Sequence, residues 1–192
     1  MLHFRVIFRI LGMLLMIYSS AYVPPFVVSL IYNDGSAATF VYSFLITFTC
    51  GALLWIPFFN EREDLRTRDG FLITVLFWFV LSLVAAIPFM LDQSPHLGPI
   101  DALFESVSGL TTTGATVISG LDTLPESILF YRQLIQWLGG IGIVVIAVAV
   151  LPMLGVGGMK LYRAETPGPV KDTKLTPRIA ETAKFLFLFT RF

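Results

Sequence analysis

Long apolar stretches dominate the sequence, and short polar or charged segments separate them. A helix needs about 20 mostly apolar residues to cross a hydrocarbon core of about 30 Å. Four stretches reach that length, at residues 1–32, 37–59, 71–91 and 126–154. The pattern therefore predicts an all-α membrane protein.

The first stretch permits two interpretations. Its charged start, apolar core and Ser19-Ser20-Ala21 are typical of a cleaved signal peptide. Apolar sequence continues beyond that site to Ile31, which favours an uncleaved first helix, with a kink at Pro24-Pro25. We therefore expect residues 1–60 to form an N-terminal pair of transmembrane helices, followed by a cytoplasmic loop at 61–70.

A shorter segment lies between the third and fourth stretches. Residues 98–116 are too polar for a lipid-facing helix. Pro99 suits the first turn of a helix and Asp101 can cap it, and an apolar stripe extends the helix over 99–110. This length is about half of what a full crossing requires. We therefore expect a re-entrant pore loop that stops near mid-depth.

Small residues follow this expected pore helix: Thr111, Thr112, Thr113, Gly114, Ala115 and Thr116. Non-helical backbone at membrane depth must be buried in protein or line water, because unpaired carbonyls cost several kcal/mol in hydrocarbon. Extended Thr residues beside a flexible Gly can direct successive carbonyls at a dehydrated cation. The C-terminal end of the short helix carries a partial negative charge, which also favours a cation there. The run predicts part of a monovalent-cation path; a hydroxyl-rich extracellular turn is the alternative.

Acidic residues accompany this segment. Asp101 caps the helix more simply than it shapes the cation field. Glu105 either attracts cations or hydrogen-bonds the back of the filter; we favour the second, which makes Glu105 and Thr116 filter support. Asp122 and Glu126 either concentrate cations at the pore mouth or lie in a solvated turn.

The fourth stretch contains small residues after Trp137, namely Gly139, Gly140 and Gly142. Small residues let another helix backbone approach closely, so we expect a packing role, with gating flexibility as the weaker alternative. Arg132 either extends to the outer interface or pairs with an acid such as Glu126 or Asp122. The sequence does not decide between these roles.

Composition narrows the function classes. Hydrophobic residues make up 56% of the 192 residues, which is too apolar for a soluble domain. Thirteen basic and 13 acidic residues cancel without a basic run, so no nucleic-acid partner is indicated. Ser106 and Ser108 lack a base partner, because the histidines are His3 and His96, and we expect no catalysis. Cys50 is most simply a small buried hydrophobe.

The basic residues predict the orientation. A cytoplasmic amino terminus with a re-entrant segment at 98–118 leaves only Arg132 toward the outside, which is the positive-inside distribution. A full crossing at 98–118 would move the basic residues from Lys160 to Arg178 outside. The residues expected inside are Arg5, Arg9, Arg62, Arg66, Arg68, Lys160, Arg163, Lys171, Lys174, Arg178 and Lys184.

A pore helix followed by SGLTTTGAT, an outer turn and RQLIQWLGGIGIVV resembles the first pore repeat of the TrkH-type subunit in the Trk/Ktr/HKT superfamily of potassium transporters. The two preceding helices fit the extra amino-terminal pair of that group. The resemblance implies a fold of two N-terminal transmembrane helices followed by one helix, re-entrant pore loop, helix repeat over residues 71–154.

The resemblance also implies a function. The carbonyls of Thr111, Thr112, Thr113, Gly114 and Ala115 would contact potassium as the transported ion, without an organic cofactor. The implied partners are a cytoplasmic nucleotide-binding regulatory subunit of the TrkA-like type and a second copy in a homodimer. The implied location is the bacterial inner membrane, as a multi-pass protein with a cytoplasmic amino terminus.

The sequence departs from the family pattern in one respect. The family pore has four repeats, and this chain contains one filter segment, a second cytoplasmic loop at 155–178 and the start of a second repeat at 179–192. We therefore expect that the chain does not conduct alone and that it is a fragment, with assembly of several copies as the alternative. A non-conducting membrane module that binds a partner through its glycine-rich face is the second functional hypothesis.

Overall fold

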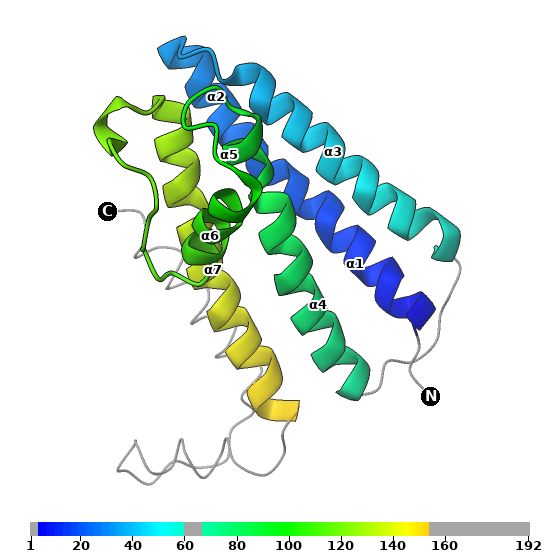
Figure 1. The fold of residues 1–192 in the computed structure, drawn as a ribbon. Coiled ribbons are helices and arrows are strands. Elements are labelled where there is room, and N and C mark those ends of the chain that lie inside the picture. The colour runs from blue at the N-terminus through cyan, green and yellow to red at the C-terminus, as the bar shows by residue number, and fades with distance from the viewer. Residues whose placement is uncertain (1–3, 60–66, 154–192) are drawn as a thin grey trace, which may run out of the picture. The chain divides into compact units, whose positions relative to one another are not determined.

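The computed structural model describes residues 4–59 and 67–153. Within these ranges the protein is all-helical and contains no β-strand, as the sequence predicted. Short 3-10 turns, η1 (Ser20–Tyr22), η2 (Ile56–Phe58) and η3 (Leu121–Thr123), lie between the α-helices. The α-helices in Figure 1 are α1 (Phe4–Ser19), α2 (Val23–Tyr32), α3 (Ala37–Trp55), α4 (Thr67–Ala85), α5 (Ile87–Leu91), α6 (Pro99–Leu110) and α7 (Glu126–Met153).

The chain divides into two units between Ile143 and Val144, and every contact given below lies in the first unit. The expected loop at 155–178 and the expected second repeat at 179–192 lie outside the described residues, as do residues 60–66. Helix α4 begins at Thr67 and so takes in the last part of the loop expected at 61–70.

Three helical segments among the described residues are long and apolar enough to cross a membrane. They are Phe4–Tyr32 with 29 residues, Ala37–Phe58 with 22 and Leu72–Leu91 with 20. Helix α7 has 28 residues, or roughly 42 Å at 1.5 Å per residue, which also exceeds the hydrocarbon thickness. The lengths and composition fit a membrane-embedded protein.

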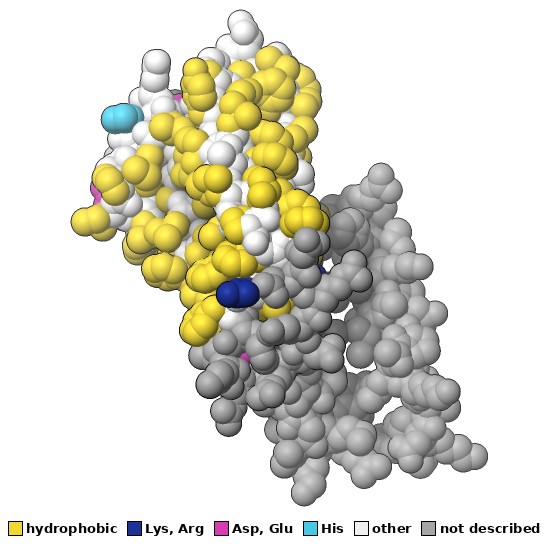
Figure 2. Space-filling model, turned by 90° about the vertical axis from the view of Figure 1, so that its right-hand side faces the viewer, with side chains coloured by type: hydrophobic (Ala, Val, Ile, Leu, Met, Phe, Trp, Pro, Cys, Tyr) yellow, Lys and Arg dark blue, Asp and Glu magenta, His cyan; other side chains and the backbone are white. Residues whose placement is uncertain are grey.

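The surface of α3 supports this conclusion. Among the described residues, hydrophobic side chains cover much of the face shown in Figure 2, on the side where α3 lies in Figure 1. The side chains that α3 buries are mostly small and polar: Thr39, Phe40, Ser43, Thr47 and Gly51. Cys50 is exposed, so the prediction of a buried Cys50 is wrong, because α3 turns its small polar side inward.

Prolines set the breaks within two of the apolar stretches. The first helix breaks at η1, just before the expected kink at Pro24-Pro25, and these prolines occupy the first turn of α2. Proline is tolerated there because the first helical N–H groups have no partner within the helix. The third stretch, expected as one helix over 71–91, is likewise divided into α4 and α5 at Ala86, with Pro88 early in α5.

Two tyrosine hydroxyls donate hydrogen bonds to backbone carbonyls at the break between α4 and α5. The Tyr22 hydroxyl donates to the Val84 carbonyl at 2.8 Å, and the Tyr131 hydroxyl donates to the Ala85 carbonyl at 2.9 Å. A continuous helix would pair Val84 with the N–H of residue 88, which proline lacks. The rings also contact one another, with centroids of Tyr22 and Tyr131 5.8 Å apart. This buried cluster therefore joins α4 to α7 and to η1.

Helices α1 and α3 cross at two glycines. An added Cβ on Gly12 would lie 2.5 Å from the Gly51 carbonyl oxygen, and one on Gly51 would lie 2.8 Å from the Gly12 carbonyl oxygen. Both distances are well below van der Waals contact. Only glycine permits this backbone separation, as is usual where membrane helices approach closely.

Asp34, in the turn between α2 and α3, holds the start of α7. Its Oδ2 accepts from the Ser127 N–H at 2.9 Å, and its Oδ1 accepts from the Ser36 N–H at 3.1 Å and from the Ser29 hydroxyl. A carboxylate at a helix N-terminus pairs with N–H groups that lack partners in the helix. Burial raises the pKa of Asp34, but the hydrogen bonds from Ser127, Ser29 and Ser36 outweigh it and lower the pKa below its usual value.

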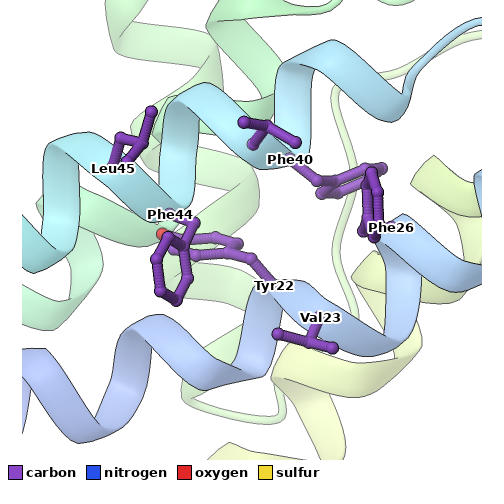
Figure 3. A pocket seen from close by; sticks show the side chains of 7 residues that line it. Tyr22, Val23, Phe26, Phe40, Phe44 and Leu45 are labelled. Carbon is purple, nitrogen blue, oxygen red and sulfur yellow. The ribbon is translucent and has the colours of Figure 1, made fainter.

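A pocket of about 340 Å³ lies between α2 and α3 (Figure 3). Its lining is hydrocarbon except for Tyr22, whose hydroxyl is engaged with Val84. The lining residues are Tyr22, Val23, Phe26, Phe40, Val41, Phe44 and Leu45. A polar ligand would find little to bind there, so the candidate site lies elsewhere.

We predict that Gly12→Leu destabilises the helix pair by about 1–3 kcal/mol, because the side chain overpacks the crossing with α3. Thermal unfolding of the purified chain in detergent, followed by tryptophan fluorescence, measures the effect. Gly70→Ala is the control, since an added Cβ there meets nothing within 4 Å. A melting temperature equal to that of the parent chain for Gly12→Leu would contradict the crossing.

We predict a pH-dependent effect for Asp34→Asn. A carboxylate with a lowered folded-state pKa contributes stability above its unfolded pKa of about 3.9 and loses it as pH falls through the folded value. Asp34→Asn should therefore lower the melting temperature at pH 7, and the deficit should shrink below about pH 4. An equal deficit at both pH values would count against the charge of Asp34.

Candidate functional site

Helix α6 precedes the candidate site. It spans Pro99–Leu110, its N-cap is Gly98, and Pro99 takes the first position. The prediction that Asp101 caps this helix is wrong: Asp101 lies in the first turn, two positions after Pro99, and its side chain is exposed. At about 18 Å, α6 is roughly half as long as a membrane-crossing helix.

The end of α6 is a Schellman motif. The Thr112 N–H donates to the Gly109 carbonyl and the Thr113 N–H donates to the Ser108 carbonyl, each at 2.9 Å. In this motif the residue after the cap adopts the left-handed conformation, which usually requires glycine. Here that residue is Thr112, with φ of +57°. A β-branched residue at positive φ is strained, and such strain concentrates at functional sites.

Backbone carbonyls beyond this motif lack protein partners. The carbonyl oxygens of Thr112, Thr113 and Gly114 accept no hydrogen bond from any residue that the structure describes. Gly114 has φ of +75°, the left-handed conformation that glycine permits. All residues from 111 to 117 are exposed. The segment therefore presents consecutive peptide oxygens at the negative end of a short helix.

Two expected filter residues are already engaged. The Ala115 carbonyl accepts a hydrogen bond from the Ser108 hydroxyl at 2.6 Å, so Ala115 differs from its neighbours. The Thr111 hydroxyl donates to the Val107 carbonyl at 2.8 Å and lies 2.8 Å from the Thr113 hydroxyl. These contacts fix both ends of the segment to α6.

Glu105 connects the helix to the segment that leaves Gly114. Its Oε1 accepts from the Thr116 hydroxyl and, at 2.7 Å, from the Val117 N–H. Its Oε2 accepts from Arg132 Nε at 3.0 Å, and only 1% of the Glu105 side chain is exposed. Both carboxylate oxygens therefore have partners.

The glycines of α7 lie against α6 and α4. An added Cβ on Gly139 would lie 2.0 Å from the Leu110 carbonyl oxygen, at the end of α6. On Gly140 it would meet Thr112 Cγ2 at 3.8 Å, and on Gly142 it would meet Trp78 at 3.3 Å. The glycine-rich face thus packs within the chain.

The hydroxyls of Ser106 and Ser108 in α6 donate hydrogen bonds to backbone carbonyls. The Ser106 hydroxyl donates to the Ser82 carbonyl at 2.7 Å and to the Leu103 carbonyl at 3.0 Å. Together with the bond from Ser108 to Ala115, these contacts hold α6 against α4 and against the segment that follows it. Neither hydroxyl is arranged beside a base.

Arg132 pairs with neither Glu126 nor Asp122, the acids expected from the sequence. Its partner is Glu105, 27 positions earlier. One available signal was charge: Arg132 is the only basic residue in the expected outer half, and Glu105 is an acid within an apolar helix face. An unpaired carboxylate at that depth would be expensive.

The TrkH family profile, described as cation transport protein, matches residues 36–192. TrkH of Escherichia coli strain K12, a Trk system potassium uptake protein, is 57% identical over 187 residues. TrkH of Halomonas elongata is 61% identical over 183 residues, and TrkG of Escherichia coli strain K12 is 48% identical over 186.

The matches cover nearly all of this chain but less than half of each relative. The matches include 97%, 95% and 97% of this chain, but 39%, 38% and 38% of the relatives. The crystal structure of the potassium transporter TrkH from Vibrio parahaemolyticus matches with a TM-score of 0.80 and 48% identity. That match covers 98% of this chain and 37% of the other. The chain thus spans about two fifths of the length of its relatives, and it belongs to the TrkH family of cation transport proteins.

Proposed function

We propose that this chain contributes one filter segment to a potassium-uptake permease. The observation that carries the proposal is the set of carbonyls at Thr112, Thr113 and Gly114, which accept no hydrogen bond from the described residues. Peptide oxygens can replace the hydration shell of a cation. The relatives are named as potassium uptake proteins, which supports potassium as the ion.

The segment functions at membrane depth in a re-entrant loop. Helix α6 is too short to cross, and it follows Leu72–Leu91, a segment long enough to do so. Exposed peptide oxygens at mid-depth are tolerated only beside water or other protein. Thr111 belongs to the filter with the three carbonyls, and Ala115 ends it through its bond to Ser108.

Glu105 and Thr116 support the filter. The carboxylate binds the Thr116 hydroxyl and the Val117 N–H, so it restrains the chain just after the expected ion path. Gly139 lets α7 approach the Leu110 carbonyl, which brings the same helix against the start of the filter. These contacts hold the backbone of the filter segment in place without adding a charged residue to the segment itself.

The rest of the pore comes from outside this chain. One segment cannot enclose a cation, and the relatives are more than twice as long, so the remaining pore repeats complete the filter and this chain alone does not conduct. The location we propose is the bacterial inner membrane with a cytoplasmic amino terminus. A TrkA-like nucleotide-binding subunit and a second copy are the proposed partners.

The competing functions have less support. A module that binds a partner through its glycine-rich face would need that face free, whereas Gly139 and Gly142 lie against Leu110 and Trp78. A hydrolase would need an activated nucleophile, whereas Ser106 and Ser108 donate to carbonyls. We therefore retain ion uptake.

We predict that Gly114→Ala lowers the selectivity of uptake, because an L-residue at φ of +75° displaces the neighbouring carbonyls. The host is a chimera in which this chain replaces the matching segment of the Escherichia coli relative. Uptake of rubidium and of sodium into cells that lack their own potassium uptake gives the ratio, which should fall by about tenfold, or roughly 1.4 kcal/mol. Gly114→Arg should abolish uptake.

Gly35→Ala is the matched control. Gly35 also has positive φ, +85°, but it lies in the turn between α2 and α3, where an added Cβ would meet nothing within 4 Å. It imposes similar backbone strain without touching the filter. Equal rubidium-to-sodium ratios for Gly114→Ala, Gly35→Ala and the parent chimera would reject the filter assignment.

A further inference from the structure

Arg132 and Glu105 form an ion pair that joins three segments of the chain. Arg132 lies in the second turn of α7, and its Nε is 3.0 Å from Glu105 Oε2 in the middle of α6. The side chains are 15% and 1% exposed. The second carboxylate oxygen of Glu105 holds the segment after Gly114, through the Thr116 hydroxyl and the Val117 N–H.

We propose that Arg132 is a positioning residue for the filter and a determinant of its cation selectivity. The inference rests on the proposed function. Arg132 does not touch the candidate ion path; it acts through Glu105, whose carboxylate it holds in a fixed orientation by the contact at 3.0 Å. That orientation places Glu105 Oε1, which accepts hydrogen bonds from Thr116 and Val117, and so limits how far the segment leaving Gly114 can move.

The geometry explains why an arginine is needed. A carboxylate with 1% exposure requires a compensating charge, because its desolvation costs more than neutral hydrogen bonds return. Arg132 donates its Nε–H to Glu105 Oε2 at 3.0 Å, and its guanidinium is a planar, rigid donor group. Lysine would supply the charge as a flexible point donor without a planar group.

The pair also sets the field near the filter. Glu105 alone would add a full negative charge one to two turns from the carbonyls, and such a charge attracts cations without regard to their size. Paired with Arg132, it adds almost no net charge. Discrimination between cations then depends on the carbonyl geometry that the same pair restrains.

The anchor on α7 is itself well fixed. Two turns further along, Gly139 lies against the Leu110 carbonyl, and near the start of α7 the Ser127 N–H donates to Asp34. Tyr131, the neighbour of Arg132, donates to the Ala85 carbonyl at 2.9 Å. Arg132 therefore extends from a stretch of α7 held at both ends, as a positioning residue requires.

The test uses Arg132→Gln, Arg132→Lys and Glu105→Gln in the chimera described above. Gln133→Ala is the matched control, since Gln133 is the next residue on α7 and its side chain is exposed. Rubidium and sodium uptake are measured beside the amount of chimera in the membrane. We expect Arg132→Gln and Glu105→Gln to lower the rubidium-to-sodium ratio by about tenfold, the size of one lost charge-assisted hydrogen bond. Arg132→Lys should recover part of the ratio, and Gln133→Ala should leave it unchanged.

The outcomes separate this inference from the proposed function. A normal ratio for Arg132→Gln that reaches the membrane, beside a lowered ratio for Gly114→Ala, would overturn the role of Arg132 alone. Normal ratios for both would overturn the filter assignment as well. If Arg132→Gln does not accumulate, Arg132→Lys decides: a ratio equal to that of the parent would reject the inference, and an intermediate ratio would support it.

Discussion

Backbone carbonyls that lose their helical partners are the constraint on which this structure depends. In hydrocarbon each unpaired carbonyl costs several kcal/mol, so a membrane protein can interrupt a helix only where something else binds the freed oxygen. The chain interrupts its helices in two different ways. At the break between α4 and α5 the oxygens are bound by protein, whereas after α6 a set of them is left for another partner.

The first interruption shows what complete compensation requires. Pro88 removes the N–H that would pair with Val84, and two tyrosine hydroxyls from distant helices bind Val84 and Ala85 instead. Placing those hydroxyls requires Tyr22 and Tyr131 to be buried together in one cluster. The chain therefore has the means to satisfy carbonyls at depth. The lack of such hydrogen-bond donors at the carbonyls of Thr112, Thr113 and Gly114 is thus a local property of that segment.

Sequence reasoning predicted what depends on composition and local spacing. The lengths of the apolar stretches predicted the long helices, and Pro99 predicted the start of α6. The small residues after Leu110 indicated non-helical backbone. It failed at two positions. The capping position is Gly98 instead of Asp101, because the helix already begins at Pro99. Arg132 pairs across 27 positions with Glu105, where a tertiary contact decides. Nothing local to either residue of that pair specifies its partner, since the approach of α6 to α7 is created by packing at Gly139.

The same packing explains how an extended, strained segment is kept in one conformation. Thr112 has the left-handed φ that glycine usually supplies, and strain of this kind persists only where the surroundings hold it. Here α6 binds the segment before Gly114 through the Schellman bonds and after it through Ser108 and Glu105. Helix α7 in turn holds Glu105 through Arg132. Because the bonds fall on both sides of the unpaired carbonyls, they restrain the segment and leave the carbonyls themselves free. Peptide oxygens that are held in place but left unpaired can replace the hydration shell of a cation, which is the role we propose for them.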